Sequence, residues 1–253
     1  MENQIVIGVT QGGCGIVLNA ERKAHGLYTD GVESCLAIVY ECELGDILFH
    51  DSGQLRVTEI CELVGRLGQV KNIHAAIGPA LDGNLHQPRL DKIIAEIRYE
   101  GDVQTLQVNS SCYAVFYSRE NGLSCAAPDL EGVLWPPNRK AREAINVLRD
   151  LFLEPGSQQL SADVQYQGGR FTDQPQLAPS IPEILDLVKS QPNFFLMNVK
   201  TLGEYAAEGV VSIPNWLSEF YERSNIESAS LSDRELERAL YKQYIELHGN
   251  NAP

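Results

Sequence analysis

TDGVESCLAIVYECELGDILFH (Thr29–His50) is the stretch of sequence that decides the fold. It contains two apolar runs, Leu36–Tyr40 and Ile47–Phe49, which are separated by a short polar turn. This pattern predicts two antiparallel strands. Pairing of these strands would bring Cys35, at the start of the first, close to His50, at the end of the second. A thiol needs such a neighbour before it becomes a thiolate nucleophile.

Cys35 stands between a small polar segment, residues 30–34, and an apolar strand. A cysteine at such an edge has one side open to substrate and a rigid element behind it. The main-chain N–H groups around Ser34 and Cys35 are candidate oxyanion donors. The alternative, which composition alone favours, is that Cys35 packs as the first residue of a core strand.

The composition is that of a soluble globular protein, with 43% hydrophobic and 21% charged residues in a chain of 253. No apolar run approaches the ~20 residues of a transmembrane helix, and the start, MENQIVIGV, lacks the features of a Sec signal peptide. We therefore expect a cytoplasmic protein, or one that another export machinery secretes or injects. A net charge of −14 without a basic stripe argues against nucleic-acid and membrane partners. We expect no cofactor and no metal.

Residues 1–127 are predicted to form a strand-rich α+β domain. The glycine-rich turn of residues 10–15 is interpreted as a hairpin turn between the first two strands, because it lacks the Gly-Lys-Ser/Thr ending of a phosphate loop. Helical spacing of apolar residues predicts helices at Val57–Leu67 and Leu90–Tyr99, the second opened by a polar loop at residues 82–88. The predicted strands are Ile5–Val9, Ile16–Leu18, Leu36–Tyr40, Ile47–Phe49, Val70–Gly78, Thr105–Val108, Tyr113–Tyr117 and Leu123–Ala126.

Residues 128–253 are predicted to form a mainly helical extension, because the composition shifts at Ala127-Pro128. The extension would pack on the first domain or recognise the substrate. Residues 156–180 are polar and are predicted to be a loop or a short hairpin, and residues 194–199 a buried strand or a short buried helix. Helices are predicted at residues 139–153, 182–189, 214–223 and 233–248.

Other chemistry-bearing residues are weaker candidates. Cys14 lies in the glycine-rich turn and has no base near it in the sequence. His74 is predicted to be a core or surface residue within a strand. Glu41, Glu43 and Asp46 are predicted to form a solvated turn. The spacings of His74, His86, Cys112 and Cys125 match no zinc pattern.

Three residues and their spacing resemble a known superfamily. Glu33-Ser34-Cys35 stands at a strand start, Thr29 lies six positions before the cysteine, and His50 lies fifteen positions after it. This arrangement is similar to that of the cysteine-dependent protein glutamine deamidases, typified by the chemotaxis protein CheD and the catalytic domain of cytotoxic necrotizing factor. The resemblance covers residues 1–127 and implies a CheD-like layered β-sandwich/α fold. Glu33 departs from it, since the family usually has glycine there.

The resemblance implies a reaction and a site. Cys35 would attack the side-chain carboxamide of a glutamine on a protein substrate, His50 would act as the base, and Thr29 would orient the imidazole. Hydrolysis of the thioester leaves glutamate, and attack by an amine gives transglutamination. The expected protein is either a bacterial effector or toxin, or a relative of the chemotaxis enzymes. Two alternatives stay open: another cysteine hydrolase (a peptidase or amidase), and a non-catalytic protein-interaction module in which Cys35 and His50 are structural.

Overall fold

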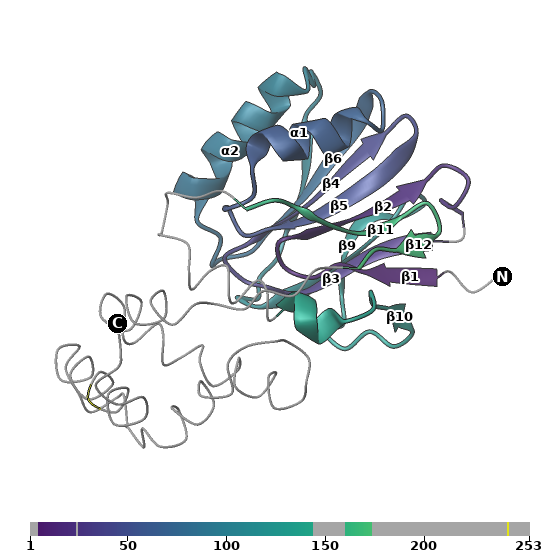
Figure 1. Ribbon diagram of the computed structural model, residues 1–253. Coiled ribbons are helices and arrows are strands. Elements are labelled where there is room, and N and C mark those ends of the chain that lie inside the picture. Colours follow the sequence, from purple (N-terminus) through teal and green to yellow (C-terminus); the bar gives the residue numbers. More distant parts are fainter. Residues whose placement is uncertain (1–4, 24, 144–159, 174–241, 243–253) are drawn as a thin grey trace. The chain divides into compact units, whose positions relative to one another are not determined.

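The computed structural model describes residues 5–23, 25–143, 160–173 and 242 (Figure 1). The chain divides into two compact units, Met1–Arg139 with Gln159–Asp173, and Lys140–Gln158 with Gln174–Pro253. The three residues of the predicted site all belong to the first unit. In the described part of the chain, no helix is long and apolar enough to cross a membrane.

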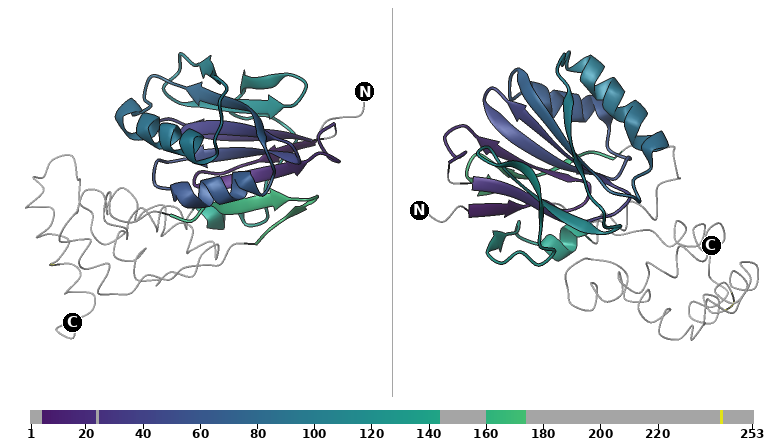
Figure 2. Two further views of the ribbon diagram at one scale, coloured as in Figure 1. Left: turned by 90° about the horizontal axis from the view of Figure 1, so that it is seen from above. Right: turned by 180° about the vertical axis from the view of Figure 1, so that it is seen from behind.

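The described strands of the first unit form two sheets (Figures 1 and 2). One sheet has five strands in the order β10-β1-β3-β8-β9, and the other has seven in the order β12-β11-β2-β5-β4-β6-β7. The five-stranded sheet comprises β1 (Ile5–Gly8), β3 (His25–Val32), β8 (Tyr113–Ser118), β9 (Gly122–Ala126) and β10 (Val133–Leu134). The seven-stranded sheet comprises β2 (Gly13–Leu18), β4 (Leu36–Cys42), β5 (Gly45–Asp51), β6 (Val70–Ile77), β7 (Val103–Gln107), β11 (Asp163–Gln167) and β12 (Arg170–Phe171).

A large part of the core lies between the two sheets. One cluster of buried side chains draws on both, with Ile7, Leu27 and Tyr117 from the five-stranded sheet and Val39 and Leu48 from the seven-stranded sheet. Fully burying side chains of this size stabilises the fold by about 1.5–3 kcal/mol each. The two sheets therefore pack face to face as a sandwich.

Two helices, α1 (Val57–Gly65) and α2 (Gly83–Glu96), lie together over the opposite face of the seven-stranded sheet (Figure 1). Side chains of a strand alternate between its faces. On β5, Leu48 therefore points into the sandwich, whereas Asp51 points outward and binds Arg89 of α2. Every residue of β4 and β5 is buried, because these strands are covered on both faces.

The α+β class is confirmed at this coarse level, and so is the antiparallel pairing of β4 with β5. The predicted helix Val57–Leu67 and the predicted strand Val70–Gly78 correspond to α1 and β6. The second helix begins earlier than predicted, at Gly83, because the side chain of Asp82 caps it by accepting hydrogen bonds from the main-chain N–H groups of Asn84 and Leu85.

The predicted hairpin between the first two strands is wrong. β1 pairs in parallel with β3, whereas β2 pairs antiparallel with β5 in the other sheet. The glycine-rich turn therefore carries the chain from one sheet to the other. Gly12 adopts a positive φ of 71° there, and its N–H donates to the carbonyl of His50 at 2.9 Å.

The first unit extends beyond the predicted boundary at residue 127. β10 pairs with β1, and the hairpin of β11 and β12 adds to the free side of β2. Gln165 of β11 holds this addition, since its side-chain oxygen accepts from Thr10 N at 3.0 Å and its nitrogen donates to Thr10 Oγ1 at 2.5 Å. Within the predicted helix 139–153, residues 139–143 are helical. The rest of that helix and the elements predicted beyond residue 173 lie outside the described residues.

Candidate active site

Thr29 and His50 come from different sheets and meet inside the sandwich. Thr29 lies on β3 and His50 on β5, and both residues are almost completely buried. Their side chains are joined by a hydrogen bond of 2.8 Å between Thr29 Oγ1 and His50 Nδ1. The structure thus brings together two of the three residues that the sequence singled out.

The hydrogen bonds of Thr29 define the protonation of the imidazole. The Thr29 hydroxyl donates its single proton to the main-chain carbonyl of Val9 at 2.7 Å. Its oxygen can therefore only accept from His50, so Nδ1 carries the imidazole proton and Nε2 carries a lone pair. His50 Nε2 is buried and has no hydrogen-bond partner. A lone pair held in this way is available to take a proton.

Burial also keeps His50 neutral. Loss of solvation lowers the pKa of the imidazole to about 4, because the charged form is disfavoured away from water. At neutral pH the ring is therefore a neutral base and not an imidazolium ion. A neutral imidazole is the form that can deprotonate a thiol.

Cys35 directly precedes β4, and its side chain packs on the face of the strand that is turned toward the other sheet. Ala37 pairs with His50 across β4 and β5, and Cys35 lies two residues before Ala37. Cys35 stands just outside the paired residues of β4, diagonally opposite His50 in the register of the two strands. Cys35 belongs to a buried cluster that includes Ala37 and Val115, and Val115 is the partner of Thr29 on β8. The thiol therefore lies in the same part of the sandwich as the Thr29–His50 pair.

The thiol is largely covered, since Cys35 is only 7% exposed. The two residues before it, Glu33 and Ser34, are exposed and form the surface at this point. Glu33 also approaches Cys112, whose thiol pKa is raised by desolvation and by interactions with Glu33. The acidic residue that departs from the superfamily pattern thus lies on the surface, two positions before Cys35.

His86 is a residue of this region that the sequence did not identify. It lies in the first turn of α2, is 2% exposed, and its Nε2 is 2.9 Å from the carbonyl oxygen of Ser34. The polar sequence around it suggested a loop. The signal that would have revealed it is the spacing of His86, Leu90 and Ile93, which are the buried residues of α2, behind the Asp82 cap.

The rival cysteine is placed away from the candidate base. Cys14 pairs with Phe49 on β5, and its neighbour in the other direction is Val164 of β11. Burial raises the pKa of the Cys14 thiol well above its usual value, with further contributions from Asp163 and Glu59. A buried thiol with a raised pKa is unreactive, so Cys14 is a packing residue.

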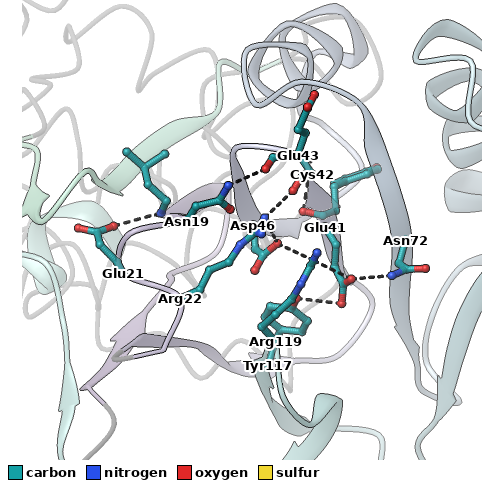
Figure 3. A network of polar contacts seen from close by, with 12 residues as sticks. Asn19, Glu21, Arg22, Glu41, Cys42, Glu43, Asp46, Asn72, Tyr117 and Arg119 are labelled. Carbon is teal, nitrogen blue, oxygen red and sulfur yellow. Dashed lines mark hydrogen bonds and ion pairs between the residues drawn. The ribbon is translucent and has the colours of Figure 1, made fainter.

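The acidic residues near the β4–β5 turn are not a solvated cluster, which corrects the prediction for Glu41 and Asp46. Both are buried, at 5% and 2% exposure, and only Glu43 is exposed. Asp46 binds Arg22 and Arg119, each at 3.0 Å (Figure 3). Glu41 accepts hydrogen bonds from four side chains, those of His74 (2.7 Å), Asn72 (2.6 Å), Tyr117 (2.9 Å) and Arg119 (2.7 Å).

This network is structural. Burial alone would raise the pKa of Glu41, but the bonds from His74, Asn72, Tyr117 and Arg119 lower it to about 2. His74 was predicted to be a core or surface residue, and the structure places it in the core with a hydrogen bond to Glu41. Glu41 lies six residues along β4 from Cys35, a distance of about 20 Å at ~3.3 Å per residue. The network is therefore remote from Cys35.

No family model matches the sequence, and no curated protein matches it. In the described part of the chain, no group of three or more His, Cys, Asp or Glu side chains is arranged to hold a metal ion. The case for a function therefore depends on the geometry around His50 and on the resemblance of the three residues and their spacing.

Proposed function

We propose that this protein is a cysteine-dependent protein glutamine deamidase. Cys35 is the nucleophile, His50 is the general base and Thr29 is the residue that orients the base. The observation that carries the proposal is the Thr29–His50 hydrogen bond, which leaves the Nε2 lone pair without a partner on the face of the β4–β5 pair that Cys35 adjoins. The two-sheet sandwich with helices on one face is compatible with the layered fold that the resemblance implies.

The first half of the reaction forms a thioester. His50 Nε2 takes the thiol proton as Cys35 Sγ attacks the side-chain carbonyl carbon of the substrate glutamine. The negative charge on the tetrahedral oxygen is stabilised by main-chain N–H groups at Ser34 and Cys35. The intermediate collapses when the protonated His50 gives its proton to the leaving nitrogen, which departs as ammonia.

The second half restores the enzyme. His50, again neutral, takes a proton from water, and the resulting hydroxide attacks the thioester carbon. The C–S bond breaks, glutamate is released, and the proton on His50 returns to the sulfur of Cys35. The sum is one carboxamide and one water converted to one carboxylic acid and one ammonia. Thr29 Oγ1 accepts a hydrogen bond from the Nδ1–H group of His50 throughout, which holds the ring in the tautomer that these steps require.

The burial of Cys35 favours a side-chain carboxamide over a peptide bond as the substrate. A peptidase must accept a chain that continues on both sides of the reacting carbon, which requires an open cleft. Cys35 is 7% exposed and His50 is 2% exposed. The glutamine side chain is long, unbranched and ends in the reacting group, so it can reach a covered thiol through a narrow opening.

Mass spectrometry of treated proteins tests the proposal. A protein extract is incubated with the full-length protein, and glutamine-to-glutamate conversion is mapped at each site. We expect conversions that disappear with Cys35→Ala and with His50→Ala and persist with Cys14→Ala, the matched change of a buried cysteine. Conversion that survives Cys35→Ala, or chain cleavage in place of conversion, would contradict the proposal. The identity of the converted proteins also distinguishes the two roles: an injected effector would modify host proteins, and a relative of the chemotaxis enzymes would modify bacterial receptors.

A further inference from the structure

Helix α2 holds the chain on both sides of the proposed catalytic pair. His86 binds the carbonyl of Ser34, the residue before Cys35. One turn later on the helix, Arg89 donates to both carboxylate oxygens of Asp51, at 3.0 and 2.8 Å, and Asp51 is the residue after His50. These two anchors keep the start of β4 and the end of β5 against the same helix.

We infer that His86 is a positioning residue that orients the Ser34–Cys35 peptide, so that the N–H of Cys35 serves as an oxyanion donor. The inference rests on the proposed function. It assigns to a buried histidine on a helix, outside the Thr29–Cys35–His50 set, a role in stabilising the negative charge that develops during thioester formation.

The orientation follows from peptide geometry. The peptide bond is planar, and the described residues contain no cis peptide, so the N–H of Cys35 points opposite to the carbonyl of Ser34. His86 holds that carbonyl toward α2. The N–H of Cys35 is therefore directed away from α2 and toward the space between the two sheets. The Cys35 side chain packs in that same space. A hydrogen bond to the carbonyl also polarises the peptide and makes its N–H a stronger donor.

The polar character of His86 serves this one contact. A carbonyl oxygen can only accept, so Nε2 carries the proton of the imidazole and Nδ1 carries a lone pair. Nδ1 is buried without a partner, a cost that an apolar residue at this position would not carry. The backbone at Gly53 packs closely against the start of α2, since a Cβ on Gly53 would lie 2.5 Å from Leu85 Cδ2 and 3.5 Å from His86 Cε1. The ring is thus held in place to donate to Ser34.

Two substitutions separate orientation of the peptide from simple packing. His86→Leu fills the site without a donor, whereas His86→Gln places an amide nitrogen near the position of Nε2. The assay measures ammonia release from the peptide acetyl-Gly-Gln-Gly-amide and, separately, the rate at which iodoacetamide alkylates Cys35. Alkylation forms no oxyanion, so it reports on the thiol alone.

We expect His86→Leu to lower kcat by about 10- to 100-fold, somewhat less than the complete loss of an oxyanion donor, with KM nearly unchanged. Alkylation of Cys35 should stay within about 3-fold of the wild-type rate, because His50 still activates the thiol. His86→Gln should recover most of kcat. Ile93→Ala is the matched control: it destabilises α2 at another buried position and leaves kcat unchanged.

Three outcomes would overturn the inference. They are a wild-type kcat in His86→Leu, an equal loss of kcat in the Leu and Gln variants, and a parallel loss of kcat and alkylation, which would place the effect on the thiol. If His86→Leu does not fold, His86→Asn replaces it, because the asparagine amide is too short to reach Ser34. A kcat of His86→Asn equal to that of His86→Gln would then overturn the inference. Ammonia release that persists in Cys35→Ala, or none from wild type on the peptide and on the extract, contradicts the proposed function itself.

Discussion

The burial of His50 makes the stability of the fold depend on pH in a defined window. The pKa of His50 is lowered to about 4 in the folded protein, whereas an unfolded histidine titrates near ~6.5. Above pH ~6.5 both states hold a neutral ring and stability is complete. Between pH ~6.5 and ~4, His50 is protonated in the unfolded chain but stays neutral in the folded protein. The free energy of unfolding therefore falls as pH falls. A difference of about 2.5 pKa units corresponds to about 3 kcal/mol.

Urea unfolding at a series of pH values measures this loss. The wild type is compared with His50→Gln, which removes the titrating ring, and with Thr29→Ser, which keeps the hydroxyl and the ring. We expect the free energy of unfolding of His50→Gln to fall by about 3 kcal/mol less than that of the wild type between pH 7 and pH 4. Thr29→Ser should follow the wild type. Equal pH dependence in wild type and His50→Gln would refute the claim that a neutral His50 is enforced by burial.

Three further substitutions test the parts of the site and its support. Thr29→Val should lower the free energy of unfolding in urea by about 1–3 kcal/mol, because it leaves the buried His50 Nδ1–H without an acceptor. It should also lower kcat by about 100-fold. Activity within 2-fold of wild type would exclude an orienting role for Thr29. Arg89→Leu should cost about 3–5 kcal/mol in thermal unfolding, since it leaves the Asp51 carboxylate buried without its partner; an unchanged melting temperature would contradict that pairing. Glu41→Gln should reduce stability but leave kcat per folded molecule unchanged, and a large loss of kcat would show that the Glu41 network reaches the site.

The sequence was sufficient for the local parts of the fold. The alternation in residues 36–49 predicted β4 and β5, because one tight turn joins them and fixes their pairing. Ala37 pairs with His50, and the buried cluster that Ala37 shares with Cys35 places the thiol on the same side of the strand pair. Helical spacing likewise predicted α1, whose buried residues repeat along one face.

Local sequence patterns could not predict the contacts between segments that are far apart in the chain. Nothing in the glycine-rich turn distinguishes a hairpin from a crossing between sheets, and the pairing of β11 with β2 joins residues about 150 positions apart in the chain. The burial of Glu41 depends on Arg119, which lies 78 positions away. His86 reaches Ser34 across 52 positions, so its contact was visible only once α2 was placed on the sheet.

The proposed reaction is hydrolysis of a glutamine side chain by Cys35 and His50 through a thioester. The most direct measurement is mass spectrometry of a converted protein after reaction in water enriched in heavy oxygen. We expect each new glutamate to carry one heavy oxygen atom from the water that opens the thioester, and no conversion with Cys35→Ala or His50→Ala. Glutamate that forms equally in Cys35→Ala, or glutamine that stays intact with every protein tested, would contradict the account.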